Sequence, residues 1–379
     1  MAKRVAGRVV APLAIMNVLA LASYPVEAAA TRYRVYQFVK PLAERGINLT
    51  VRPFLDSDAF GRLYQSGRLM QTAFGLSVST MRRFGDVFSV RDSDVLFVQR
   101  EAMTLGPPVI EWLATKIGRC PMVLDLDDAT YVSYTSPTYG RLGKTLKWFS
   151  KTDDLIRWAR VVTCGNRVIA EYVASKGTRA TVIPTVVDTD VFRPANPDGH
   201  DAALIVGWVG THSTYPFLKS IFPVLQKLAG DHSFRLKVVG AGTDDVSIPG
   251  VEVENVPWQL SRETSDFQSF DIGLYPMDAA SYGSEWIKGK SCFKAIQYMA
   301  VGVPYVVTPV GVCAEIGEAG LTHFTANSPD EWYEALRTLL KDGERRQRMG
   351  KAGRQHALTH YNVSDQADKL AQALREASI

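Results

Sequence analysis

The sequence predicts an α/β protein of two doubly wound, Rossmann-like domains that face a central cleft. Short apolar runs alternate with helical patterns along the whole chain, and one proline-rich stretch near the middle interrupts this alternation. The length of 379 residues also suits two domains better than one ordinary core. With 46% hydrophobic and 22% charged residues, the composition excludes a disordered chain.

The first domain is predicted over residues 16–187. Runs rich in Val, Ile and Leu predict buried strands of a parallel sheet at 19–22, 49–51, 95–99, 122–126, 161–164 and 181–183. Helical patterns fill the intervals at about 33–45, 107–118, 142–160 and 166–176.

Residues 184–200 contain three prolines and no helical period, which predicts a linker at 188–202. A second domain follows over 203–360, and we expect a C-terminal helix at 361–379 that packs back on the first domain. Its strands are predicted at 203–209, 235–239, 251–253, 272–275, 305–308 and 321–324. Its helices are predicted at about 214–229, 261–268, 290–301 and 330–341, with a helical tail over 344–377.

The N-terminus allows two interpretations. Two basic residues, an apolar stretch over 9–22 and small residues at 28–30 imitate a secretory signal peptide. The alternative is a buried strand at 18–23, which we favour because cleavage near residue 30 would remove the strand that the next helix needs as a partner. Residues 1–15 are then an unstructured extension. No apolar run reaches the roughly 20 residues that span a bilayer.

The net charge of +4 hides an uneven distribution. Residues 1–187 hold 25 Lys and Arg against 15 Asp and Glu, a balance of +10, and the remainder holds 18 against 24, a balance of −6. A basic first half predicts contact with an anionic group, although a surface that is merely rich in arginine is the alternative.

The cysteines lie far apart in the sequence, with no CxxC pair and no histidine at ligand spacing: Cys120, Cys164, Cys292 and Cys313. This spacing argues against a disulfide framework and against a structural zinc site. We therefore expect no metal and a cytoplasmic protein.

A strand, a glycine-containing turn and the start of a helix follow one another over residues 205–218. Gly207 and Gly210 would let the backbone approach a ligand, and Ser213 or Thr214 would cap a helix whose free N–H groups attract phosphate. The alternative is a turn that only packs tightly.

A second segment, 286–307, carries two lysines and a glutamine at helical spacing. Lys290, Lys294 and Gln297 would share one face of a helix that starts near residue 290. Two lysines beside a phosphate-binding turn could neutralise a diphosphate, and the Gln297 amide could bond sugar hydroxyls. A solvated basic face is the alternative.

Together these segments resemble GT-B glycosyltransferases, specifically the bacterial branch of glycosyltransferase family four. Residues 294–304 with 308–311 look like the donor-site segment, 207–214 is similar to the donor-phosphate turn, and 270–276 to the strand before the donor loop. Markers of the N-terminal domain are similar at 99–101, 106–108, 124–128, 165–166 and 183–185. The resemblance covers nearly the whole chain from Asn17 and is specific in combination.

The resemblance implies a cofactor-free, metal-independent hexosyltransferase that moves a sugar, with retention, from a nucleotide-diphosphate donor. The acceptor would be a glycan or a lipid-linked molecule in bacterial surface polysaccharide or glycolipid synthesis. The implied donor-binding residues are Gly207, Gly210, Thr211, His212, Ser213, Trp258, Lys290, Lys294 and Gln297. The implied acceptor-binding residues of the basic domain are Arg32, Arg34, Arg100 and Asn166. Cations suit this chemistry because the leaving-group charge must be stabilised.

Some positions depart from the family pattern. The wider family uses two glutamates separated by seven residues, and the corresponding positions here are Gly289 and Gln297. All six histidines also follow the domain boundary, so no catalytic residue transfers directly. Asp127 and Asp128, at the end of a predicted strand, are the remaining candidates for orienting the acceptor or removing its proton. The alternative is that either aspartate caps the next turn.

Two other functions stay open from the sequence. The signal-like N-terminus would suit an exported two-domain sugar-binding protein, and the missing glutamates would suit a GT-B protein that has lost transfer activity. The basic stretch 144–151 could rest at the inner face of an anionic membrane, or pack its aromatic residues inward. No contact with nucleic acid is expected.

Overall fold

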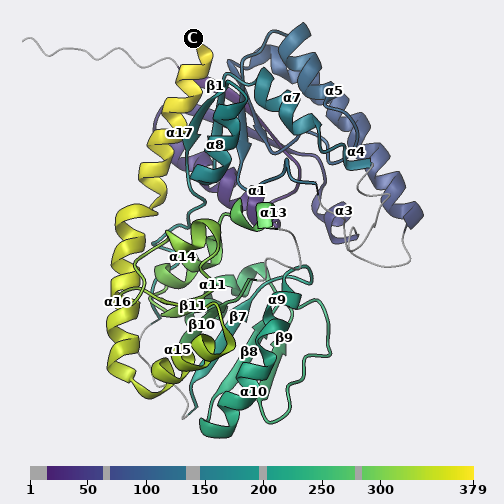
Figure 1. Ribbon diagram of the computed structural model, residues 1–379. Helices are drawn as coiled ribbons and strands as arrows, with labels where there is room; N and C mark the ends of the chain where they lie inside the picture. The colour runs from purple at the N-terminus through teal and green to yellow at the C-terminus, as the bar shows by residue number, and fades with distance from the viewer. Residues whose placement is uncertain (1–14, 63–68, 134–145, 196–202, 278–283) are drawn as a thin grey trace, which may run out of the picture.

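The computed structural model describes residues 15–62, 69–133, 146–195, 203–277 and 284–379. They form two α/β domains, each built on a six-stranded parallel sheet (Figure 1). The predicted fold class is therefore confirmed. Most of the expected N-terminal extension and part of the expected linker, residues 1–14 and 196–202, lie outside the described residues.

The N-terminal sheet has the strand order β2-β1-β3-β4-β5-β6. Its strands are β1 (Met16–Ala22), β2 (Ile47–Pro53), β3 (Val95–Gln99), β4 (Met122–Leu126), β5 (Val161–Cys164) and β6 (Arg179–Val182). The first strand pairs with both β2 and β3, inside the sheet. The cleavage near residue 30 that a secretory signal requires would remove this inner strand.

Helices cover both faces of this sheet because successive side chains of a strand point to opposite faces. Leu19 and Leu21 of β1 pack on one side, whereas Val18 and Ala20 pack on the other. The α-helices between the strands are α1 (Ala29–Arg34), α2 (Val39–Ala43), α3 (Ser57–Arg62), α4 (Leu69–Ser89), α5 (Val109–Trp112), α7 (Lys151–Trp158) and α8 (Arg167–Ser175). A π-helical turn, η3 (Leu113–Ile117), extends α5.

The C-terminal sheet has the order β12-β11-β10-β7-β8-β9, the strand order of a Rossmann fold. Its strands are β7 (Ile205–Val209), β8 (Arg235–Val239), β9 (Glu252–Val256), β10 (Ile272–Tyr275), β11 (Tyr305–Val307) and β12 (Phe324–Thr325). Its helices are α9 (Tyr215–Ser220), α10 (Phe222–Asp231), α11 (Glu263–Gln268), α13 (Ser284–Lys288), α14 (Phe293–Ala300), α15 (Pro329–Lys341) and α16 (Gly343–His360).

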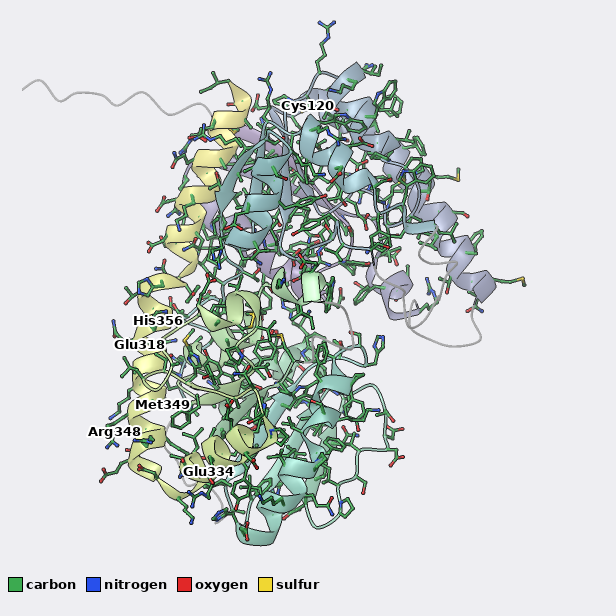
Figure 2. The ribbon with its side chains drawn as sticks, in the orientation of Figure 1. Cys120, Glu318, Glu334, Arg348, Met349 and His356 are labelled. Carbon is green, nitrogen blue, oxygen red and sulfur yellow. A yellow bond between two sulfur atoms is a disulfide. The ribbon has the colours of Figure 1, made fainter. Side chains whose placement is uncertain are left out.

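The chain ends in α17 (Val363–Ser378), which packs on the N-terminal domain. Along one side of the molecule, α16 follows the C-terminal domain, with Met349 directed inward and Arg348 outward (Figure 2). After a break at 361–362, α17 places Leu370 and Leu374 in the core of the N-terminal domain. The two domains therefore share one continuous C-terminal segment.

Two helices of the N-terminal domain differ from the predictions. The helix expected at 142–160 is described only from residue 146, and α7 begins at Lys151. Residues 134–145 lie outside the described part of the chain. The longest helix of the protein's described portion, α4, was not predicted at all. None of the described helices is long and apolar enough to cross a bilayer.

A buried ion pair lies between α1 and β4 of the N-terminal domain. The Arg34 Nε atom donates to an Asp125 carboxylate oxygen at 3.0 Å, and both side chains are at most 2% exposed. Thr163 also donates to Asp125, at 2.6 Å. Burial alone would lower the pKa of Arg34, but the Asp125 carboxylate raises it above its usual value. Arg34 thus joins α1 to β4 inside the domain and is not a free cation.

Replacement of Arg34 by methionine should lower the free energy of unfolding by about 3–5 kcal/mol, because Asp125 would stay buried without a counter-charge. Urea unfolding followed by circular dichroism measures this loss. Arg179→Gln is the control, since its ion pair with Glu376 is largely exposed and should contribute less than about 1 kcal/mol. A similar small effect for both variants would contradict the interpretation.

Candidate functional site

A cleft of about 630 Å³ lies between the two domains. The carboxyl ends of both parallel sheets face it, which is where ligands bind in doubly wound proteins. The loops after β7 and β10 meet there, at the point where the strand order of the C-terminal sheet reverses. Among the residues that line it are Arg100, Asp127, Asp128, Thr211, Trp258, Tyr275, Lys290 and Lys294.

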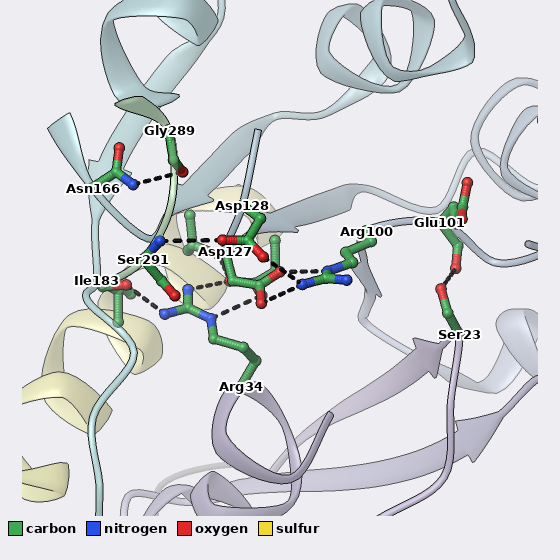
Figure 3. Close-up of polar contacts among 12 residues, drawn as sticks. Ser23, Arg34, Arg100, Glu101, Asp127, Asp128, Asn166, Ile183, Gly289 and Ser291 are labelled. Carbon is green, nitrogen blue, oxygen red and sulfur yellow. Dashed lines mark hydrogen bonds and ion pairs between the residues drawn. The ribbon is translucent and has the colours of Figure 1, made fainter. Parts of the chain in front are cut away.

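Arg100 organises the N-terminal wall of the cleft (Figure 3). Its guanidinium binds both carboxylate oxygens of Asp127, at 2.6 and 2.7 Å, and approaches Asp128 at 3.3 Å. Its backbone has a φ of +63°, an uncommon conformation for an arginine. Burial by itself would raise the pKa of Asp127, but the adjacent Arg100 charge holds it below its usual value. Asp127 is therefore an ionised partner of Arg100.

Asp128 differs from Asp127 because it also touches the other domain. One of its carboxylate oxygens accepts a hydrogen bond from the backbone N–H of Ser291 at 3.1 Å. Its side chain remains 23% exposed to the cleft, compared with 6% for Asp127. Of the two predicted catalytic aspartates, both of which line the cleft, Asp128 is thus the more accessible to a ligand.

The backbone around Gly289 docks directly on the N-terminal domain. The Asn166 side-chain amide donates to the carbonyl oxygens of Gly289 at 3.0 Å and of Lys290 at 3.3 Å. A Cβ atom at position 289 would lie 2.4 Å from the Cβ of Ala129. The position that carries a glutamate in the wider family therefore has no room for a side chain in this domain arrangement.

Two lysines form the cationic part of the C-terminal wall. Lys290 lies before α14 rather than on it, and its Nζ sits 4.0 Å from the centre of the Trp286 ring. Lys294, on α14, donates to the Gln297 side chain at 3.0 Å. Burial lowers the pKa of both lysines, and that of Lys294 falls to about 8. Such cations would bind an anionic ligand favourably, since it would compensate for their desolvation.

The turn after β7 is built around Gly210. A Cβ atom there would overlap the Trp208 ring at 2.1 Å, so only glycine fits. The hydroxyl of Thr214 accepts from the Thr211 backbone N–H at 3.0 Å, and that of Thr211 is 2.8 Å from Ser213. Thr214 precedes α9 but does not cap it with its side chain, contrary to expectation.

Glu263, at the start of α11, is a cleft residue that the sequence did not single out. Its carboxylate accepts hydrogen bonds from Arg32 at 2.8 Å and from the Tyr33 hydroxyl at 2.7 Å, both in the other domain. Its second oxygen lies 3.4 Å from the Gln297 amide nitrogen. Burial, reinforced by Glu263, raises the pKa of Tyr33 well above its usual value, so the phenol stays protonated and donates. The residues next to Glu263 in the sequence give no sign of this contact, because its partners Arg32 and Tyr33 belong to the other domain.

Several predicted site residues serve packing instead. Gly207 lies within β7, where a Cβ atom would overlap the Phe270 ring, and it does not line the cleft. The Gln297 side chain is fully buried and bonded to Lys294 and Glu263, so it does not reach the cleft directly. Gly210, Thr211, His212, Ser213, Trp258, Lys290 and Lys294 do line it.

The predicted acceptor residues separate in a similar way. Only Arg100 lines the cleft, and its charge is matched by two aspartates. Arg34 cannot contact a ligand in the cleft, because its side chain is buried against Asp125. Arg32 and Asn166 join the domains through Glu263 and Gly289, so neither is an uncommitted anion-binding group.

A disulfide joins Cys292 and Cys313, whose Cα atoms are 5.4 Å apart. The argument from sequence spacing against a disulfide is wrong here, because Cys313 lies in the turn η5 (Gly311–Ala314), which folds back beside the start of α14. Cys120 and Cys164 are free and buried. Cys120 lies at the far end of the N-terminal domain (Figure 2). Among the described residues, no three His, Cys, Asp or Glu side chains are grouped to hold a metal ion.

Comparisons with known proteins agree with this architecture. Residues 277–356 match the family model of glycosyl transferases group 1. Anabaena HepE in complex with UDP is 14% identical with a TM-score of 0.65, over 95% of this chain and 100% of that chain. Sucrose-phosphate synthase from Thermosynechococcus elongatus is 13% identical with a TM-score of 0.67, over 95% and 98%. The lipopolysaccharide outer core galactosyltransferase WaaB is 13% identical with a TM-score of 0.57, over 95% and 99%.

No curated protein sequence matches the chain significantly. The two facing Rossmann-like domains and the cleft between them define a GT-B fold, the fold that the resemblance implied. Within that class, the C-terminal domain carries the segment typical of glycosyl transferases group 1.

Thiol titration tests the disulfide beside the site. The unfolded, unreduced protein should show two free thiols, and four after reduction, because Cys292 and Cys313 are paired and Cys120 and Cys164 are not. Cys292→Ser should lower the free energy of unfolding by about 3 kcal/mol through the lost loop constraint. Four thiols without reduction would contradict the pairing.

Proposed function

We propose that this chain transfers a hexose, with retention, from a nucleotide-diphosphate sugar to a glycan or lipid-linked acceptor. The observation that carries the proposal is that two half-buried lysines face a carboxylate across one cleft: Lys290 and Lys294 lie on one wall and Asp128 on the other. The role would lie in bacterial surface polysaccharide or glycolipid synthesis, at the cytoplasmic face of the membrane. The structural similarity to WaaB, a lipopolysaccharide outer core galactosyltransferase, supports testing this role.

The C-terminal wall suits the donor. The diphosphate would lie at the turn of Gly210 and Thr211, with Lys290 and Lys294 balancing the charge that develops on the leaving group. These cations would take the place of a metal ion. Trp258, which also lines the cleft, would stack on the base. Anabaena HepE has been solved with UDP and with UDP-glucose, which makes uracil the first base to test.

The N-terminal wall suits the acceptor. Asp128 would accept the proton of the attacking hydroxyl, since its carboxylate is exposed to the cleft and held in place by the Ser291 N–H. Arg100 keeps Asp127 ionised next to Asp128. By holding the loop that carries both aspartates, Arg100 would also keep the acceptor hydroxyl oriented. The stretch around residue 148 is a further candidate for membrane contact, with Trp148 half-exposed; residue 144 lies outside the described residues.

A second candidate is a GT-B protein that binds a nucleotide sugar without transferring it. The observation that favours it is the contact of Gly289 with Ala129, which leaves no room for the family's carboxylate. Detection of glycosyl transfer, lost on replacement of the cleft lysines, would exclude this candidate.

Calorimetry with UDP-, GDP- and other nucleotide sugars tests the proposal. We expect one base class to bind, and Lys290→Ala or Lys294→Ala to weaken that binding about 10- to 100-fold through a lost charge-assisted bond to phosphate. Lys288→Ala is the matched control, because that lysine is exposed and paired with Glu285. Folded protein that binds none of these donors would refute the proposal.

Replacement of Asp128 by asparagine should separate catalysis from binding. We expect transfer to fall by a factor of about 10² to 10⁴ while donor affinity stays unchanged, because the amide still accepts from Ser291 but cannot take a proton. Asp127→Asn, the control, should mainly lower thermal stability by weakening the pair with Arg100. Undiminished transfer by the Asp128 variant would remove this residue from the mechanism.

A further inference from the structure

Glu263 is a buried carboxylate in the cleft wall that the proposed reaction does not use. Its side chain belongs to a residue that is 4% exposed, yet it lines the cleft together with Trp258 and Lys294. One of its carboxylate oxygens faces the N-terminal domain, and the other faces α14. A single side chain of α11 thus connects the N-terminal domain to the helix that carries a cleft lysine.

The N-terminal domain holds Glu263 through two side chains that are themselves fixed. Arg32 reaches Glu263 through one Nη atom, and its other Nη atom donates to two backbone carbonyls of the preceding loop, at 2.9 and 3.0 Å. Tyr33 donates its hydroxyl to the same Glu263 oxygen. The Tyr33 ring packs on Phe293, with the ring centres 4.5 Å apart. Contacts of the N-terminal domain therefore fix the position of the Glu263 carboxylate.

The Gln297 amide connects Glu263 to Lys294. A carboxylate only accepts hydrogen bonds, so Gln297 must turn its amide nitrogen toward Glu263, 3.4 Å away. The amide oxygen is then left to face Lys294, whose Nζ atom donates to it at 3.0 Å. Glu263 thus decides which end of the buried amide Lys294 meets.

Charges of both signs surround the Lys294 ammonium group. Glu263 attracts it, whereas Arg32 and Lys290 repel it. The rings of two phenylalanines also lie 5.3 and 6.0 Å from its Nζ atom. Burial lowers the pKa of Lys294 to about 8, and the Glu263 charge opposes this fall. About half of the Lys294 side chains are therefore charged at pH 8, so a change at Glu263 would alter that fraction strongly.

We propose that Glu263 is a positioning residue, which holds the Lys294 ammonium group through the Gln297 amide and is itself held by Arg32 and Tyr33. That Lys294 meets the diphosphate of a donor rests on the proposed function. The link between Glu263 and Lys294 follows from the contacts alone. Through this link, the strength of a cation in the C-terminal domain depends on the N-terminal domain.

An NMR titration of the lysine side chains of the full chain tests the link without any donor. The Lys294 signal is assigned by its loss in Lys294→Arg, and in the wild type it should titrate near pH 8. Glu263→Gln keeps the size of the side chain and removes its charge, so Lys294 should titrate about one pH unit lower. Gln297→Met breaks the same link at its other end and should shift the titration in the same direction. Unchanged titrations in both variants would overturn the proposal.

Calorimetry with UDP measures the consequence for binding as a pH profile. At pH 6 the Lys294 side chain is charged in both proteins, so Glu263→Gln should bind UDP like the wild type. At pH 8 a smaller fraction of the variant's Lys294 is charged, and UDP binding should be about fivefold weaker. In a Lys294→Ala background, Glu263→Gln should change UDP binding at neither pH, because Glu263 acts through the lysine.

Asp266→Asn is the matched control for these measurements. Asp266 is a similarly buried carboxylate of the same helix, but it pairs with Lys237 at 3.1 Å. This variant should leave the Lys294 titration and the UDP profile unchanged, and a shift as large as that of Glu263→Gln would overturn the proposal. If Lys294→Ala binds UDP like the wild type while Glu263→Gln still shifts the titration, the proposed function fails but the link stands.

Tyr33→Phe tests the part played by the N-terminal domain, because it keeps the ring and removes the hydroxyl that holds Glu263. UDP binding at pH 8 should fall about two- to fivefold, and this loss should disappear in a Glu263→Gln background. An equal loss in both backgrounds would overturn the role of Tyr33, since it would then act by another route.

Discussion

The arrangement of the cleft depends on the backbone contact between residues 289–291 and the N-terminal domain. Asp128 and Asn166 hold this segment by hydrogen bonds, and Ala129 occupies the space that a side chain at position 289 would need. The same segment carries Lys290 and leads into α14 with Lys294. Because the lysines belong to a segment whose backbone also touches Asp128, the contact between the domains fixes how far Lys290 and Lys294 lie from the Asp128 carboxylate.

The fold and the cation wall could be predicted from the sequence because both follow from local patterns. Buried parallel strands appear as short runs of Val, Ile and Leu, and their carboxyl ends must meet at one edge. This logic brings residues 127–128, 210–213 and 290–294 together without any knowledge of contacts. Lys290 and Lys294 line the cleft as expected, although only Lys294 belongs to the helix.

The remaining features depend on which distant residues meet, and a local pattern carries no such information. Arg34 resembled a surface cation until its partner Asp125, 91 positions away, was known. Glu263 has no distinctive neighbours in the sequence, and Cys292 meets Cys313 only because a turn folds back beside α14. Helix α4 was missed for another reason: two glycines and several hydroxyl residues weaken its helical signal, and its apolar period faces away from the core.

The return of α17 to the N-terminal domain affects the order in which the chain can mature. Residues 363–378 are made after the whole C-terminal domain, yet Ala367, Leu370 and Leu374 complete the core beneath β3, β4 and β5. During synthesis, the part of the N-terminal sheet that α17 covers, at β3, β4 and β5, must therefore stay exposed while the second domain assembles. The usual sequence of maturation, first domain first, is reversed at the final step. A ribosome-bound nascent chain would thus hold a finished C-terminal domain beside an unfinished N-terminal domain.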